Sequence, residues 1–245
     1  MKRTIAAIIT LCIGVLLSSS IVHADEIPPA AFVEGLIGHP QEHNLSCESR
    51  SATDLAAFWN ETFTEDEFFY RLPKSDNPHK GFLGNVDSPA GSMPPTGYGA
   101  YAKPVAANLR SFGLDAQAKL IWSLSALKAN LAVGKPAIVW ATYDMHLPSV
   151  ETWTSSDGAT SIVTKWQHTF IAVGYDEKGI YLIDAYDSTT KYFPYEAFNS
   201  AWNQLGRQAV TVEGSLEPRK ERWKMATADD SRLFVVNGRW VVGPE

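Results

Sequence analysis

One cysteine, Cys47, stands at the start of an expected helix, within the stretch QEHNLSCESRSATDLAAFW that runs from Gln41 to Trp59. The chain has two cysteines, and the other, Cys12, lies inside an apolar N-terminal run. The positive end of a helix dipole and its unpaired N–H groups favour a thiolate over a thiol. Because the thiolate is the nucleophilic form, this position predicts covalent catalysis through Cys47.

A catalytic thiolate needs a base, and His168 opens the apolar stretch HTFIAVGYD, which has the character of a strand. The next such stretch, GIYLIDAYD, carries Asp184 near its end. A turn over residues 176–179 would join the two as a hairpin and bring His168 and Asp184 toward the same end. Asp184 would then orient the imidazole by accepting from its far nitrogen. Asp187 competes for that role, although its position better suits a turn residue.

Gln41 lies six residues before Cys47 and offers a side-chain N–H donor. An attacked carbonyl carbon leaves negative charge on its oxygen, and two N–H groups aimed at that oxygen stabilise it. The sequence therefore predicts an oxyanion site formed by the Gln41 amide and the backbone N–H of Cys47.

The elements that must position these residues can be read from periodicity and capping signals. Helices are expected from Ser46 onward, with Ser46 as N-cap, and over 64–72, where Thr64 and Glu67 form a capping box. Further helices are expected over 103–112, 124–133 and the stretch PYEAFNSAW, the first two followed by Gly113 and Gly134. Strands are expected in KPAIVWATY, WQHTFIAVGYD, GIYLIDAY, TTKYFPY and RQAVTVEG. Because helices come first and antiparallel strands second, the pattern predicts an α+β fold.

Two segments fall outside this pattern. Residues 73–99 are dense in Pro and Gly, fit no periodic element, and are expected to form an ordered loop that contributes to a substrate groove. Residues 215–245 form a predicted C-terminal extension, with a polar linker followed by a β-hairpin around Asn237 and Gly238. The predicted domain organisation is therefore a signal peptide over 1–24, one domain over 25–214 and this extension.

These motifs together resemble the papain-like cysteine peptidases, and most nearly the stand-alone relatives of the double-glycine-leader, or bacteriocin-processing, peptidases. The resemblance runs from the neighbourhood of Glu42 to Val212, and it rests on the Cys and His blocks, with NPHKGFLGN as a supporting loop motif. It implies a papain-like fold in which a nucleophile at a helix start packs on an antiparallel sheet.

The resemblance also implies a role for each residue. Cys47 matches the nucleophile, His168 the general base and acid, Asp184 the orienting residue and Gln41 the oxyanion donor. Transporter-linked members of the family usually carry Gly after the cysteine, whereas this chain carries Glu48.

The N-terminus has the three parts of a bacterial secretory signal peptide, namely the positive charges of Lys2 and Arg3, an apolar run, and a small residue at Ala24. Cleavage near Ala24 predicts a secreted or cell-envelope protein with no stable membrane insertion. It would also remove Cys12, leaving one thiol, which in a secreted protein is reactive, joined to a partner, or a buried small hydrophobe.

The net charge of the chain and the spacing of its histidines argue against two kinds of partner, nucleic acids and metal ions. The net charge is −6, and loss of Lys2 and Arg3 would make it −8, so nucleic-acid binding has no electrostatic basis. His39 and His43 are four apart, but no matching ligand set follows, so no metal is expected. The proposed chemistry requires no organic cofactor either.

The sequence therefore predicts a secreted, thiol-dependent peptidase or amide hydrolase that acts on a peptide or protein. Two alternatives stay open. One is a catalytically silent binding module of the same fold. The other is an acyl or amide transferase, in which an amine replaces water in resolving the thioester.

Overall fold

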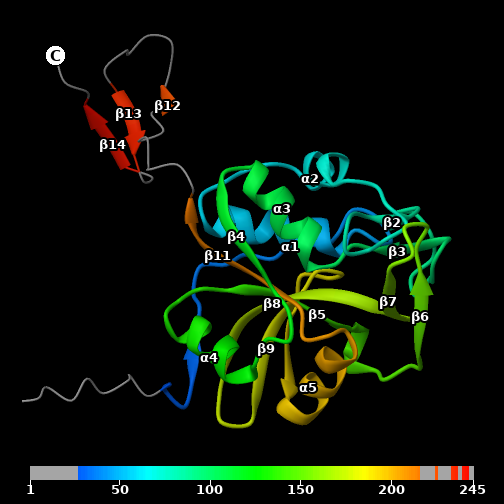
Figure 1. Cartoon of the computed structure of the whole chain (residues 1–245). Helices are drawn as coiled ribbons and strands as arrows, with labels where there is room; N and C mark the ends of the chain where they lie inside the picture. The colour runs from blue at the N-terminus through cyan, green and yellow to red at the C-terminus, as the bar shows by residue number, and fades with distance from the viewer. Residues whose placement is uncertain (1–26, 216–223, 226–232, 237–238, 243–245) are drawn as a thin grey trace, which may run out of the picture.

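The computed structural model describes residues 27–215, 224–225, 233–236 and 239–242, so the predicted signal peptide lies outside the described residues. A seven-stranded sheet forms its centre. Its strands are β1 (Ala31–Phe32), β4 (Leu114–Lys119), β5 (Ala137–Thr142), β8 (Gln167–Tyr175), β9 (Gly179–Asp184), β10 (Thr190–Pro194) and β11 (Ala209–Ser215). They lie in the order β10-β9-β8-β5-β11-β4, with β1 also on β8, and every pair is antiparallel (Figure 1).

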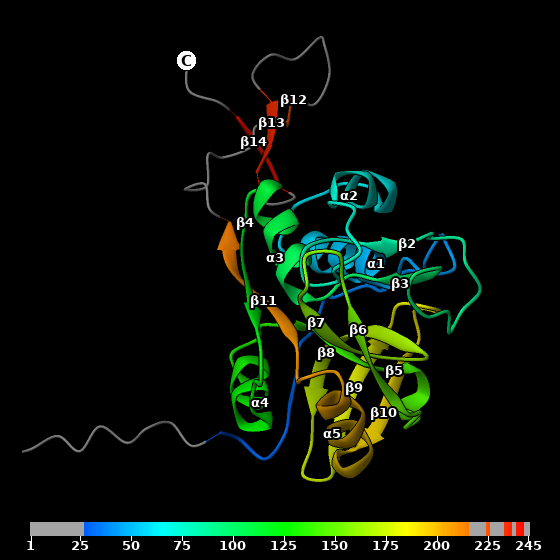
Figure 2. The same cartoon turned by 45° about the vertical axis from the view of Figure 1, so that its right-hand side comes forward.

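Helices cover both faces of this sheet (Figures 1 and 2). One face carries α1 (Cys47–Phe58), α2 (Glu65–Arg71) and α3 (Ala102–Ser111), and the other carries α4 (Leu124–Ala132) and α5 (Tyr195–Gln204). A hydrophobic core lies on each side. The predicted α+β class, with N-terminal helices packed on an antiparallel sheet, is confirmed.

The two central strands read as continuous apolar runs because both of their faces are covered. β5 is buried along its whole length, and in β8 only Gln167 is partly exposed. Trp140 of β5 points into the core beneath α1 and α3, and Phe170 of β8 into the core beneath α4 and α5. Complete burial of such a side chain contributes about 1.5–3 kcal/mol, so this sheet is a rigid mount for the residues at its ends.

Local signals set most helix ends as predicted. Thr64 accepts a hydrogen bond from the backbone N–H of Glu67, whose carboxylate accepts from the N–H of Thr64, so the capping box before α2 is confirmed. Gly134 follows α4 with a φ of +76°, a left-handed conformation that suits glycine. Ser46 precedes α1 as predicted, but its hydroxyl makes no capping bond and instead bonds the backbone of His43.

The loop over residues 73–99 is ordered and packed, as expected, but it is not free of strands. It contains β2 (Leu83–Gly84) and β3 (Gly97–Gly99), which pair with each other. Phe82 and Tyr98 of this loop are buried in the core. Two-residue pairings of this kind leave no periodic signal, which explains why the sequence did not predict them.

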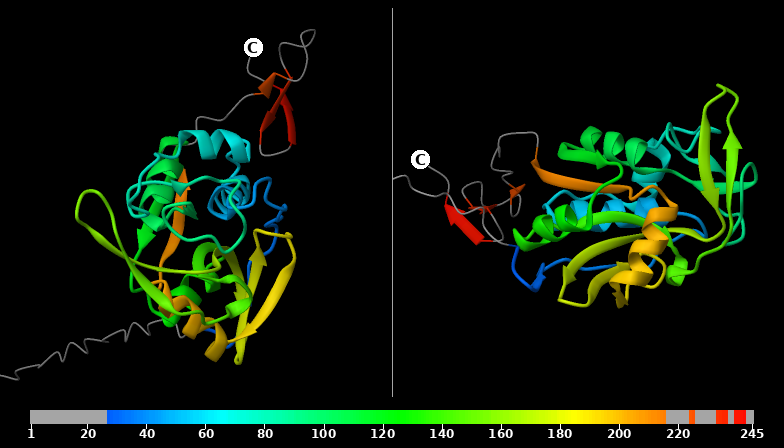
Figure 3. Two further views of the ribbon diagram at one scale, coloured as in Figure 1. Left: turned by 90° about the vertical axis from the view of Figure 1, so that its right-hand side faces the viewer. Right: turned by 60° about the horizontal axis from the view of Figure 1, so that its bottom comes forward.

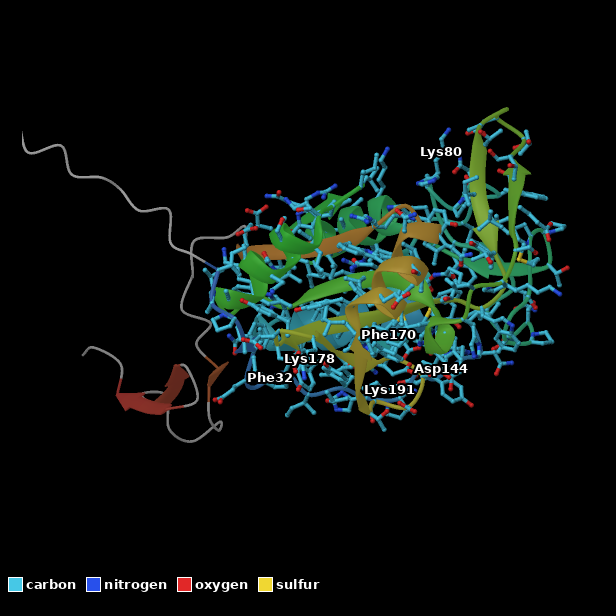
Figure 4. All side chains as sticks on the ribbon, turned by 90° about the horizontal axis from the view of Figure 1, so that it is seen from below. Phe32, Lys80, Asp144, Phe170, Lys178 and Lys191 are labelled. Atoms are coloured by element: carbon cyan, nitrogen blue, oxygen red, sulfur yellow. The ribbon has the colours of Figure 1, made fainter. Side chains whose placement is uncertain are left out.

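The sequence also failed to predict β4 and a hairpin between β5 and β8. The hairpin consists of β6 (Val150–Thr154) and β7 (Thr160–Thr164), and it projects from the body (Figure 3). Its turn contains Asp157 and Gly158, a pair that favours hairpins and was the available signal. Asp157 pairs with Lys80 of the 73–99 loop at 2.6 Å, so Lys80 lies beside the hairpin (Figure 4).

The C-terminal region contains the predicted hairpin strands. β13 (Leu233–Val236) and β14 (Arg239–Val242) pair antiparallel, while their turn lies outside the described residues. The predicted linker is wrong at Lys224–Met225, which forms β12 and pairs with β13. The division of the chain at residue 215 stays a prediction. Within the described ranges, no helix has the length and apolar character needed to cross a bilayer.

Candidate active site

Cys47 is the first residue of α1, and this end of the helix meets a pocket of about 200 Å³. α1 packs against β8, and His168 enters the same pocket from that strand. Gln41 also lines it, as do Ala90, Gly91 and Tyr98 of the 73–99 loop. Aromatic side chains form much of the remaining wall: Tyr143, Trp166 and Tyr186. The structure thus brings three of the four predicted site residues to one cavity.

The fourth residue, Asp184, lies behind the imidazole. The β8–β9 hairpin pairs Phe170 with Asp184, and Nε2 of His168 lies 2.6 Å from Oδ1 of Asp184. With Nε2–H donating to that carboxylate, Nδ1 carries the lone pair. No described residue forms a hydrogen bond with Nδ1. The ring is therefore held by one nitrogen and free to exchange a proton at the other.

Asp184 is fully buried, and its hydrogen-bond partners keep its carboxyl group ionised. Its Oδ1 also accepts from the backbone N–H of Tyr186 at 2.8 Å, and its Oδ2 accepts from Nζ of Lys191 at 2.6 Å. Burial alone would raise the pKa of Asp184, but the hydrogen bonds and positive charge of His168 and Lys191 outweigh it and lower that pKa to about 2. This carboxylate is therefore available as an acceptor across the pH range of ordinary enzymes.

The competing carboxylate, Asp187, serves the turn. Its Oδ1 accepts from the backbone N–H and hydroxyl of Thr189 at 3.0 and 2.6 Å. Its Oδ2 lies 3.2 Å from Nζ of Lys191. The structure places Asp184, and not Asp187, beside His168.

The Gln41 side chain lies in the pocket, but its amide is engaged locally. Nε2 donates to the backbone oxygens of His43 and Asn44 at 2.7 and 2.9 Å, which uses both of its hydrogens. Its Oε1 is buried and has no hydrogen-bond partner among the described residues. In this arrangement the amide braces the turn that leads into α1, and an oxyanion would have to draw one N–H away from it.

The prediction that Cys47 is a thiolate is wrong for the folded chain, in which the thiol is buried. Cys47 is 4% exposed, and burial, followed by the negative charge of Glu48, raises the pKa of its thiol well above the ordinary value. Hydrogen bonds from Thr169 offset this only in part. The helix N-terminus lowers a thiol pKa where solvent or a cation supports the charge, and neither is provided by this buried position next to a carboxylate.

Three contributors to the site were not identified as such from the sequence. Lys191 ion-pairs with Asp184, Tyr143 packs edge-on against the His168 ring at 5.7 Å, and Glu48 accepts from the Cys47 thiol. Glu48 alone had a signal, since it is the residue at which the sequence departs from the Gly that the resemblance to transporter-linked peptidases implies. Trp166 was expected on the strand with His168, but it precedes β8 with a φ of +62° and stands over Gly91.

The two histidines before α1 serve structural roles. His39 Nδ1 lies 2.8 Å from Asp54, and the ring of His43 bridges Asp66 at 2.9 Å and Asp87 at 3.1 Å. Across the described ranges, no group of three or more His, Cys, Asp or Glu side chains is placed to hold a metal ion.

Comparison with known proteins gives a family. A family model described as the Peptidase_C39 like family matches residues 37–210, which is more than half of the chain. The uncharacterized protein YvpB of Bacillus subtilis is 29% identical over 139 residues, a match that covers 56% of this chain and 53% of that protein. The chain therefore spans about half the length of this curated relative.

Two solved structures are similar to this chain, and the one with the higher TM-score agrees with it on the fold. A protein of Bacillus anthracis assigned to the C39-like peptidases superposes with a TM-score of 0.67 at 21% identity, covering 75% of this chain and 96% of that one. A double glycine motif protease from an AMS/PCAT transporter, solved with its leader peptide, gives a TM-score of 0.45 at 14% identity, covering 75% and 96%. The resemblance predicted from the Cys47 and His168 motifs is confirmed, and the chain belongs to the Peptidase_C39 like family.

Proposed function

We propose that this protein is a thiol-dependent peptidase or amide hydrolase in which Cys47, His168, Asp184 and Gln41 do the chemistry. The observation that carries the proposal is the His168–Asp184 pair at 2.6 Å, which opens on the same pocket as Cys47. Export after cleavage near Ala24 belongs to the same proposal, with a peptide or protein outside the cytoplasm as substrate.

The first half of the reaction acylates the enzyme. Nδ1 of His168 takes the proton of the Cys47 thiol, and the sulfur forms a bond to the substrate carbonyl carbon. The carbonyl π electrons move to oxygen, where the backbone N–H of Cys47 and an N–H of Gln41 stabilise the charge. Collapse of this intermediate breaks the C–N bond, and the leaving amine takes the proton from Nδ1. A thioester on Cys47 remains.

The second half releases the acid. Water gives a proton to Nδ1 while its oxygen attacks the thioester carbonyl. The C–S bond breaks, and the sulfur recovers the proton from His168, which restores the starting thiol. Throughout, Asp184 accepts from Nε2, holds the ring in one tautomer and stabilises the imidazolium that forms twice per cycle.

The sharpest test uses a peptidyl epoxide, because opening of the epoxide ring needs a proton from the imidazolium. We expect the wild type to be labelled at Cys47, and His168→Ala to be labelled about 10²-fold more slowly or worse, the usual size of an acid–base contribution. Mass spectrometry of the intact protein measures both rates. Iodoacetamide labelling in urea, which needs no acid, is the control and should be equal in both proteins. Equal epoxide rates in the folded proteins would contradict the proposal.

Gln41 provides a separate prediction. Gln41→Ala should lower kcat about 10²–10³-fold with little change in KM if its amide moves to the oxyanion, because that contact exists only in the transition state. Steady-state kinetics on a fluorogenic peptide would measure this. Retained kcat with reduced thermal stability would instead mean that the amide only braces the turn at His43 and Asn44.

The burial of Cys47 against the Glu48 carboxylate, which raises the pKa of the thiol, is the specific observation that favours the silent binding module. In that case the folded wild type would resist both the epoxide and iodoacetamide, and Cys47→Ala would keep full biological activity. Transfer to an amine is separated from hydrolysis by product analysis with an added amine, since the same thioester serves both reactions.

A further inference from the structure

Glu48, the residue after the nucleophile, is a carboxylate sealed inside the protein. Its exposure is 0%. Among the described residues no Lys, Arg or His forms an ion pair with it. Burial of a carboxyl group without a counter-ion is costly, so its retention beside the nucleophile calls for a specific role.

Neutral donors hold this carboxyl group from three directions. Oε2 accepts from the thiol of Cys47, with Sγ at 3.4 Å. Oε1 accepts from the backbone N–H of Ala100 at 2.9 Å and from Nε2 of Gln167 at 3.2 Å. Gln167 immediately precedes His168 on β8, and Ala100 follows β3. One side chain thus links the start of α1 to the strand that carries the base and to the loop that lines the pocket.

The backbone around Glu48 leaves room for its carboxyl group and for little else. At Gly99 a Cβ atom would lie 2.2 Å from Oε1 of Glu48, and the φ of Gly99 is +125°, a conformation that favours glycine. The carbonyl of Ala100 accepts from the indole Nε1 of the buried Trp140 at 2.9 Å, which fixes the peptide that follows. Gly99, Ala100 and Gln167 therefore form a cradle that fits the Glu48 carboxyl group and holds it beside the Cys47 thiol.

We propose that Glu48 is a positioning residue for the nucleophile, which holds the Cys47 thiol by a hydrogen bond at rest and, while it is ionised, opposes loss of the thiol proton. This deepens the proposed function, on which its catalytic meaning rests. The interaction with the thiol does not depend on turnover.

The electrostatics agree with this geometry. Burial raises the pKa of Glu48 to about 7, while the hydrogen bonds from Ala100 and the Cys47 thiol oppose that rise. The thiol pKa is raised by burial and by the charge of Glu48. The other titratable groups that face Glu48 are the phenols of Tyr98 and Tyr101, whose raised pKa values keep them neutral, and His168 beyond Gln167. Cys47 and Glu48 therefore compete for one proton.

The charge on Glu48 changes the cost of ionising the Cys47 thiol. Below a pH of about 7, Glu48 is neutral, and loss of the thiol proton puts a single negative charge in the cradle. Above it, Glu48 is ionised, and a thiolate 3.4 Å away would be a second buried negative charge. The fraction of thiolate still rises with pH, but the charge of Glu48 moves that rise to higher pH than a neutral residue at this position would.

The test is the pH profile of iodoacetamide alkylation at Cys47 between pH 5 and 10, in wild type and Glu48→Gln. The glutamine keeps the size and the acceptor for Ala100, and it removes the charge. We expect the midpoint of the profile to fall by at least about one pH unit in Glu48→Gln. Glu151→Gln, on the exposed face of β6, removes one surface charge and should leave the midpoint unchanged. An unchanged or higher midpoint in Glu48→Gln would overturn the proposal.

A second measurement keeps the proposal testable if Glu48→Gln does not fold. Carboxyl ¹³C NMR of glutamate-labelled wild type should show one group that titrates near pH 7, and its midpoint should rise in Cys47→Ala because the thiol donor is lost. Titration of every glutamate near the ordinary value of about 4.3 would exclude the shared proton. Both readouts are independent of hydrolysis, so a failed peptidase assay with a shifted alkylation profile rejects the proposed function and retains the role of Glu48.

Discussion

Replacing Cys47 by alanine is expected to lower turnover of peptide substrates at least about 10⁴-fold, because without the thiol no thioester can form. The substrate can be a peptide library prepared from a proteome digest, with new N-termini counted by mass spectrometry. The substitution removes one sulfur atom from a buried site, so the fold should survive with a modest loss of stability. Turnover by Cys47→Ala within tenfold of wild type would eliminate the nucleophile role.

Ser49→Ala is the matched control on the same helix. Ser49 is buried on α1, and its hydroxyl has no hydrogen-bond partner among the described residues. Its removal should leave turnover unchanged while perturbing α1 to a similar extent. If Ser49→Ala lost activity as completely as Cys47→Ala, the loss would reflect disturbance of α1 rather than absence of the thiol.

The second large effect is expected for Asp184→Asn, which should lower kcat about 10³–10⁴-fold. An asparagine amide can donate to Nε2 of His168, which moves the ring proton to Nδ1 and blocks acceptance of the thiol proton. It also removes the negative charge that stabilises the imidazolium. Steady-state kinetics should show the loss in kcat rather than in KM, because Asp184 lies behind the ring and away from the pocket lining.

Asp187→Asn separates the orienting role from general electrostatics. Asp187 shares Lys191 with Asp184 but forms neither a hydrogen bond nor an ion pair with His168, so its loss should change kcat only a few-fold. A thermal melt of each variant controls for folding, since Asp184 is buried and Asp187 is partly exposed. Equal losses in the two variants would argue that Lys191 and its charge balance, not the His168–Asp184 bond, carry the effect.

Part of this site could be predicted from the sequence because the interactions are local along the chain. The apolar runs and turn signals of residues 167–184 define one hairpin, and a hairpin with a short turn brings the residues at its open end together. His168 and Asp184 therefore meet as expected, at 2.6 Å. The capping box at Thr64 and the glycine after α4 are equally local, and both were predicted correctly.

Contacts between segments that are far apart in the chain could not be predicted from the sequence. Glu48 meets Ala100 and Gln167, which lie 52 and 119 residues away. Nothing in the local pattern around Cys47 indicates that both would close over its neighbour. Likewise, β4 pairs with β11 across the edge of the sheet, and its short alternation of Leu114 with alanines is a weak strand signal.

The sequence by itself determined the helices, most of the long strands of the central sheet, the α+β class and the identity of the residues that could react, since these depend on periodicity, caps and side-chain chemistry. Only the tertiary structure decided the ionisation of those residues. The pKa of a thiol depends on whether solvent, a cation or a carboxylate surrounds it, and that is set by packing between segments far apart in the chain. For this reason the helix start predicted a thiolate at Cys47, whereas the folded chain buries a thiol against Glu48.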